Sequence, residues 1–113
     1  MSMSLQAAEA ECAAVSVAPR VSLDDIKAAI RSEYHFTGAQ AIAQLQAPID
    51  CALEVLSVCL VVMNNGFVIV GKSAPASAEN FNADLGAKLA YEDCIRQLWP
   101  LMGYALRDRL AAA

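Results

Sequence analysis

A chain of 113 residues with a net charge of −4 has the length of a single domain. Its sequence pI of about 4.7 argues against binding to duplex DNA or RNA, which takes a dense basic surface. The residues are 58% hydrophobic, and a chain this small cannot easily bury so much apolar surface alone. We therefore expect a homo-oligomer built from symmetric dimers, up to an assembly such as a hexamer.

No membrane or secretion signal stands out. The longest apolar run, Val58–Met63, is far too short to span a bilayer. The N-terminal sequence MSMSLQAAEAE lacks the charged and apolar regions of a signal peptide. We therefore expect no membrane partner.

The cysteines and the one histidine give no metal signature. Cys12, Cys51, Cys59 and Cys94 are widely spaced and form no CxxC pair. We interpret them as reduced thiols rather than as disulfides or zinc ligands. His35 alone cannot build a multi-histidine site. We expect no metal, no cofactor and no catalytic residue, because no nucleophile–base pair can be recognised either.

The N-terminal residues 1–20 are rich in Ala and Ser and indicate a flexible arm ahead of one domain over 21–113. A helix is expected to begin after Ser22, whose hydroxyl can cap it. Asp24 and Asp25 suit its positive end. Its apolar face would be Leu23, Ile26 and Ile30, with Arg31 near its end and Tyr34-His35-Phe36 as its exit.

The middle of the chain predicts a second helix and then a β-hairpin. Thr37 is a candidate cap for a short helix over Ala39–Leu45, and a further helix is expected over Ile49–Leu56. The β-branched runs on either side of Asn64-Asn65-Gly66 predict two strands, the second over Phe67–Gly71, because Asn and Gly tolerate the positive φ of a tight turn.

A long helix is expected to start near Ser77, and Pro100 should stop or kink it before a last short helix over Pro100–Leu110. The fold class is therefore α+β: a short antiparallel hairpin packed with several helices, including a long C-terminal helix. A lone hairpin is marginal, so it should pair with a second copy or lie on the long helix.

The small residues between Gly71 and Ser77 form the leading candidate site. A loop from a strand end to a helix start can bring backbone N–H groups to an anion. Three other patterns are weaker evidence for a binding site. GFVIVGKS over 66–73 formally fits a phosphate-binding loop, but its middle is strand-like. The aromatic and arginine residues of the C-terminal third, and Tyr34-His35-Phe36, fit packing at least as well as binding.

Three stretches together resemble a known family of small tailed-phage and prophage proteins, the gene-forty-nine-like proteins. The resemblance covers Val21–Leu110 and is carried by SLDDIKAAIRSEYHFTGAQA, NNGFVIVGKSAPASAENFNADLGAKLA and IRQLWPLMGYALRDRL. The chain is also similar to the viral Thoeris anti-defence sponges. Those proteins bind cyclic ADP-ribose signals made by bacterial TIR enzymes, some also bind cyclic oligonucleotides such as those of CBASS, and they oligomerise without degrading the signal.

This resemblance implies a non-enzymatic protein in the host bacterial cytoplasm that sequesters a cyclic nucleotide immune signal. The alternative is a small structural or regulatory phage protein that acts by protein–protein binding. The resemblance points to Phe67, to the loop serine and to C-terminal arginines. Together with the loop argument, it gives the following candidate ligand-binding residues: Phe67, Gly71, Lys72, Ser73, Ala76, Ser77, Asn80, Arg96, Arg107 and Arg109.

Overall fold

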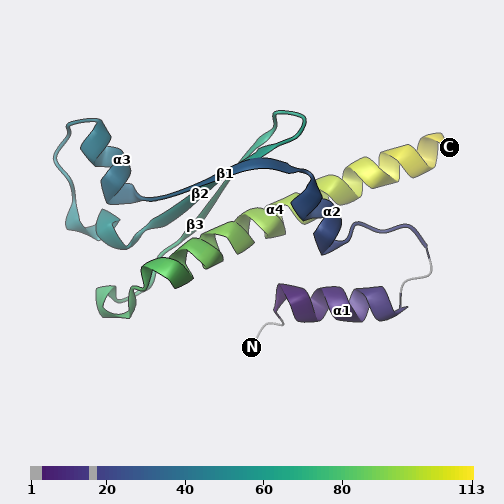
Figure 1. Cartoon of the computed structure of the whole chain (residues 1–113), viewed down its shortest axis with the longest axis horizontal. Coiled ribbons are helices and arrows are strands. Elements are labelled where there is room, and N and C mark those ends of the chain that lie inside the picture. The colour runs from purple at the N-terminus through teal and green to yellow at the C-terminus, as the bar shows by residue number, and fades with distance from the viewer. Residues whose placement is uncertain (1–3, 16–17) are drawn as a thin grey trace.

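A three-stranded antiparallel sheet and one long helix form the centre of the molecule (Figure 1). The computed structural model describes residues 4–15 and 18–113. The elements in chain order are α1 (Leu5–Val15), α2 (Leu23–Ala28), β1 (Ile30–Thr37), α3 (Gly38–Gln44), the 3-10 turn η1 (Cys51–Val55), β2 (Ser57–Met63), β3 (Val68–Ser73), the 3-10 turn η2 (Ala78–Asn80) and α4 (Ala83–Ala112). The α+β class with a long C-terminal helix is confirmed.

The predicted hairpin turn between β2 and β3 is confirmed. Gly66 has a φ of +88°, a conformation that residues with a Cβ rarely adopt. The side-chain oxygen of Asn65 accepts a hydrogen bond from the Phe67 N–H at 3.0 Å. The Asn64 side-chain amide donates to the Ala28 carbonyl at 3.0 Å. The turn is therefore tied to the end of α2 and not only to its own strands.

The prediction of a two-stranded hairpin is wrong by one strand. Helix α2 begins as expected, with Ser22 and Asp25 in a reciprocal capping box, but it ends at Ala28. Residues 30–37 then form β1, in which Tyr34 pairs with Leu60 of β2. Aromatic residues fit a pleated, half-buried surface, and here the pairing with β2 outweighs the helical spacing of Ile26 and Ile30.

Three helix boundaries also differ from the prediction. The helix expected over Ile49–Leu56 is only the short 3-10 turn η1. The long helix does not start at Ser77, because Asn82 caps α4 by accepting from the Leu85 N–H at 3.0 Å. Pro100 lies inside α4 instead of ending it. Proline has no N–H to bond to the Arg96 carbonyl, and both Pro100 and Arg96 are exposed residues.

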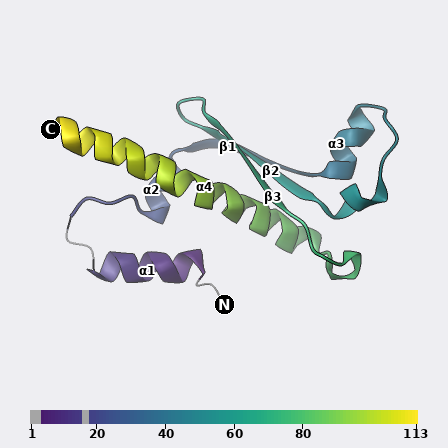
Figure 2. The ribbon, with the colours of Figure 1, turned by 180° about the vertical axis from the view of Figure 1, so that it is seen from behind.

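The N-terminal segment contains a helix where the sequence predicts a flexible arm. Alanine has the highest helix propensity, and α1 is rich in it. Glu9 of α1 forms an ion pair with Arg20 and accepts from the Leu23 N–H at 3.0 Å. The hydrogen bond from Arg20 lowers the pKa of the Glu9 carboxyl. Figures 1 and 2 show α1 beside α2, on the side away from the sheet.

Helix α4 packs across β3 and β2 and buries one face of these two strands. The largest fully buried side chains include Val61 from β2, Ile95 and Leu98 from α4, and Ile26 from α2. The radius of gyration is 16.8 Å, whereas a compact chain of this length has about 13 Å. The described residues thus form an elongated unit, in which one sheet packs against α4 and none of the described helices covers the other sheet face.

Candidate functional site

A cleft of about 410 Å³ lies between the β2–β3 turn and the second half of α4. Its volume falls in the range of small-molecule sites, about 300–1,000 Å³. Three segments line it: the end of α2, the turn, and one face of α4. The lining residues are Ala29, Met63, Asn64, Asn65, Phe67, Leu98, Leu101, Met102 and Ala105.

Local hydrogen bonds hold the turn side of this cleft in place. The backbone N–H of Asn64 donates to the Ala29 carbonyl at 2.8 Å, and Met63 donates to the Phe67 carbonyl at 2.8 Å. Phe67 therefore sits on a fixed backbone although the residue is 54% exposed. A half-exposed aromatic residue on a rigid turn is preorganised for stacking, because little conformational entropy is lost on binding.

The chemistry of the cleft fits a flat, mostly apolar group with polar edges. Leu98, Leu101 and Met102 give it an apolar wall, and two asparagines of the turn provide its amide groups. Aromatic stacking and edge hydrogen bonds are how proteins hold a nucleobase. Of the candidate ligand-binding residues, Phe67 alone lines this cleft.

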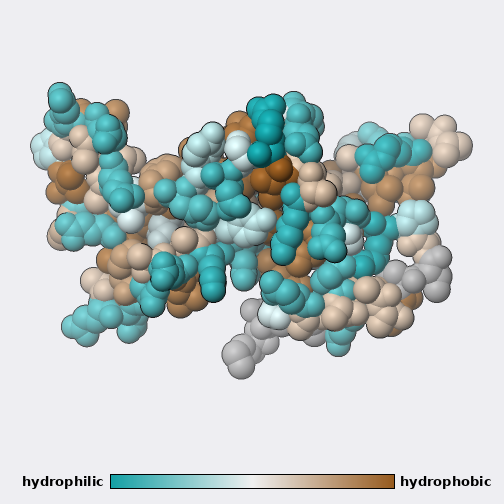
Figure 3. Space-filling model, viewed as in Figure 1, coloured by the Kyte–Doolittle hydropathy of each residue, from teal (hydrophilic) through white to brown (hydrophobic). Residues whose placement is uncertain are grey.

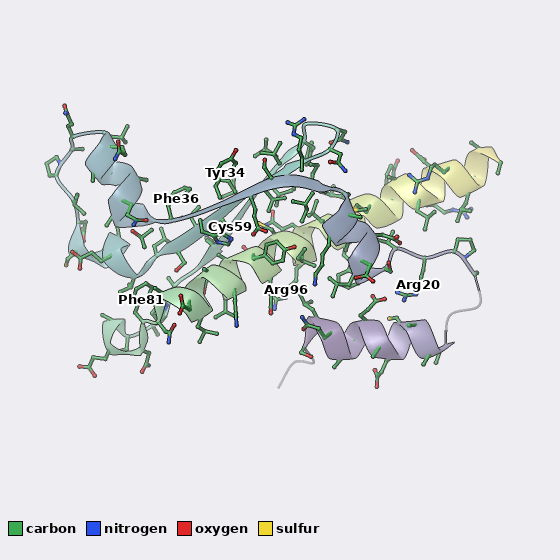
Figure 4. The ribbon with its side chains drawn as sticks, viewed as in Figure 1. Arg20, Tyr34, Phe36, Cys59, Phe81 and Arg96 are labelled. Carbon is green, nitrogen blue, oxygen red and sulfur yellow. The ribbon has the colours of Figure 1, made fainter. Side chains whose placement is uncertain are left out.

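The three candidate arginines lie on two faces of α4. Arg109 follows Leu101 and Ala105 at intervals of four residues, so it continues the cleft face one turn further on. Arg96 and Arg107 lie about half a turn round the helix from Leu98. Arg96 pairs with Glu92 at 3.4 Å, and Figure 4 shows it pointing away from the sheet. Of the three arginines, only Arg109 lies on the cleft face of α4.

The remaining candidate residues lie at the other end of β3, about 20 Å from the turn at the rise of an extended strand. Ser73 and Asn80 line a smaller pocket of about 160 Å³. Ala76 and Ser77 are exposed in the loop beside it, and the Ser77 side chain makes no capping bond. Figure 1 shows this loop at the start of α4, far from the turn. The structure thus separates residues that the sequence placed in one site.

Gly71 and Lys72 have structural positions that the sequence did not predict. Gly71 faces α4, where a Cβ would overlap the Ala90 carbonyl oxygen and lie 2.6 Å from the Cys94 sulfur. This glycine therefore permits close packing and presents no surface to a ligand. The Lys72 N–H donates to the Asp93 carboxylate at 2.9 Å.

Sequence reasoning missed most of the cleft, including Asn64 and Asn65 as lining residues and the α4 face with Met102. The asparagines were assigned to the turn alone. Leu98, Leu101 and Ala105 do recur at helical spacing, and this periodicity was the available signal. This periodicity does not show which element faces that side of α4, because the sequence predicts that the helix stops or kinks at Pro100.

A second cluster joins Glu33 and His35 of β1 to Cys59 of β2, with ligand atoms within 4.8 Å of one another. These residue types are zinc ligands. His35 and Cys59 are paired across the strands, and the His35 ring lies 2.8 Å from the Glu33 carboxylate. Burial raises the pKa of the Cys59 thiol, which disfavours the thiolate that a metal needs. The arrangement is accounted for by an exposed Glu33–His35 hydrogen bond above a core thiol.

The fold is thus an α+β sheet-and-helix unit with a cleft suited to a small planar ligand. The family model of the phage protein (N4 Gp49/phage Sf6 gene 66) family matches residues 21–110, nearly the whole sheet-and-helix unit. The chain belongs to this family. No curated protein and no solved structure matches the chain. Among the helices of the described residues, none is long and apolar enough to cross a membrane.

Proposed function

We propose that this phage-family protein binds a cyclic nucleotide immune signal, a cyclic ADP-ribose isomer or a cyclic oligonucleotide, and sequesters it without degrading it. The observation that carries the proposal is the cleft at the β2–β3 turn, where Phe67 faces an apolar helix wall beside two asparagine amides. The family resemblance supplies the ligand class, and the cleft supplies a place for its base.

Sequestration works by mass action, so the site has to bind tightly and be present in excess over the signal. To remove most of a micromolar signal, Kd must be well below micromolar, a binding free energy of about −10 to −12 kcal/mol. Stacking on Phe67, hydrogen bonds from the turn amides and a phosphate contact from Arg109 are the contributions that this chain offers.

The test is depletion followed by release. Purified protein is incubated with cyclic ADP-ribose isomers or cyclic oligonucleotides, the free nucleotide is measured after ultrafiltration, and the sample is boiled and analysed by mass spectrometry. We expect the free pool to fall and boiling to return the same molecule. Hydrolysed product in amounts exceeding the protein would show an enzyme instead.

Phe67→Ala should abolish most of the depletion while the unfolding midpoint changes little, because the residue is half-exposed. Tyr104→Ala is the matched control: it removes the aromatic ring of a residue that is 73% exposed and lies outside the cleft. Equal effects of the two variants would contradict the proposed site.

A second candidate function is that of a structural or regulatory protein that acts by protein–protein binding. The specific observation in its favour is the apolar sheet face that no described element covers. Failure to deplete any nucleotide tested would favour this candidate.

A further inference from the structure

The sheet face opposite α4 is apolar and uncovered within the part of the chain that the structure describes. Alternate residues of each strand point to this outer face, and the strand register aligns them in three rows. We define the outer face by its residues: Ser32, Tyr34 and Phe36 of β1, Val58, Leu60 and Val62 of β2, and Val68, Val70 and Lys72 of β3.

Exposure shows how unusual this face is for an isolated molecule. Tyr34 is 56% exposed, Val68 is 54% exposed and Val70 is 55% exposed, whereas Val61 and Ile69, on the α4 side of β2 and β3, are buried. Figure 4 shows Tyr34 and Phe36 directed away from α4. A contiguous apolar patch of this kind marks an interaction surface, because a sheet normally buries an apolar face against a second layer.

Neither edge of the sheet is a free alternative for association. On β3, the Lys72 N–H is bonded to Asp93, and the Val70 carbonyl accepts from the Gln97 side chain at 2.7 Å. Two of the outward backbone groups on that edge are therefore occupied by α4. On β1, the register shifts between Ile30 and Ser32. The edge also carries the exposed charged residue Glu33 and its partner His35. Bulges and charges discourage strand addition.

We propose that the outer face packs against the same face of a second copy, which gives a symmetric dimer with a two-sheet core. The face is self-complementary in charge: Lys72, at one end of β3, is its one side chain that carries a charge at neutral pH. A twofold axis across the strands places the two lysines at opposite ends of the interface, where both stay at the rim. A face of this composition therefore has no charge to bury when it meets its own copy.

The size of the face also fits a second copy. Three strands about 4.8 Å apart and seven residues long at about 3.4 Å each give roughly 340 Å² of flat area per copy. The accessible area is larger because side chains stand out from the sheet, so two copies together approach the low end of stable interfaces, about 1,200 Å². Sheets packed in this way lie about 10 Å apart. The second copy supplies the layer that the elongated monomer lacks.

The test compares the mass of three chains by light scattering over a range of concentrations. The wild type should have twice the monomer mass of 12.0 kDa, or a multiple of that. Val70→Asp should shift the mass to 12.0 kDa, because the dimer would have to bury a carboxylate in its centre. Leu45→Asp, at a position that is 71% exposed on another surface, is the control and should behave as the wild type does.

Circular dichroism checks that Val70→Asp keeps its helix content. If that variant does not fold, Tyr34→Glu tests the same face from β1. A wild-type chain that stays monomeric at hundreds of micromolar overturns the proposal, and so does a folded Val70→Asp or Tyr34→Glu variant that keeps the wild-type mass. A folded variant that keeps the wild-type mass would point to association through strand edges or through α4. None of these readouts depends on the proposed nucleotide, so the two proposals fail separately.

Discussion

The backbone of Gly71 in β3 lies directly against Ala90 of α4, so closely that a Cβ on the glycine would overlap the Ala90 carbonyl oxygen. A strand and a helix pack this tightly only where one side chain is reduced to a hydrogen. The contact fixes how α4 crosses β3, and thereby which face of α4 meets the β2–β3 turn. It therefore positions the cleft indirectly, although Gly71 does not line it.

Gly71→Ala should destabilise the protein by about 3 kcal/mol, at the upper end of what overpacking costs, because the overlapped atom belongs to the backbone and cannot turn away. Gly103→Ala is the matched control within α4. A Cβ at Gly103 meets nothing within 4 Å, so this substitution should stabilise the helix by about 0.5–1 kcal/mol. Urea unfolding followed by circular dichroism measures both. A Gly71→Ala variant as stable as the wild type would show that β3 and α4 do not approach this closely.

Arg109→Ala should weaken nucleotide binding about tenfold or more, since a charged hydrogen bond to phosphate is worth about 1.5–3 kcal/mol. Arg96→Ala, on the far side of α4, should leave Kd unchanged. Isothermal titration with the depleted nucleotide checks the pair. Because only a few charged side chains would contact the phosphates of the ligand, moderate salt should weaken binding only slightly. An equal loss in both variants, or a steep salt dependence, would contradict the placement of the phosphate beside Arg109.

The four cysteines should separate into two pairs by reactivity with an aromatic disulfide reagent at mildly alkaline pH. Cys12 and Cys51 are exposed and should react at once. Burial raises the pKa of the Cys94 thiol to about 12 and also raises that of Cys59, so these two stay protonated and should react only on unfolding. Absorbance of the released thiolate counts the groups. Four fast-reacting thiols in a folded sample would contradict the packing of α4 on β2.

The cap of α2 should make stability fall in acid. Hydrogen bonds with Ser22 lower the pKa of the Asp25 carboxyl. Because the folded pKa lies below the unfolded value of about 3.9, the stabilisation is present above that value and is lost as pH falls through the folded pKa. The free energy of unfolding should therefore drop between neutral pH and pH near 3 by more in the wild type than in Asp25→Asn. Parallel pH profiles for the two proteins would show that the capping box contributes nothing.

The sequence was sufficient to predict the structure wherever residues close together in the chain determine the conformation. The turn at Asn64-Asn65-Gly66, the caps at Ser22 and Thr37 and the alternation in β2 all depend on residues a few positions apart. The sequence by itself therefore predicted the fold class and the hairpin. It also named Phe67 as a candidate through the family resemblance, and the cleft that Phe67 lines became visible only in the tertiary structure.

Only tertiary structure decided the elements and contacts that depend on distant partners. Residues 30–37 become a strand because they pair with β2, and α4 runs through Pro100, where both Pro100 and Arg96 are exposed residues. Figure 3 shows hydrophobic and hydrophilic surface side by side over the C-terminal end of α4. The same long-range packing places Phe67 and Asn80 at opposite ends of β3 and turns Arg96 and Arg109 to different faces. Sequence order states how far apart residues are along the chain, whereas the site depends on which faces of β3 and α4 are buried against each other.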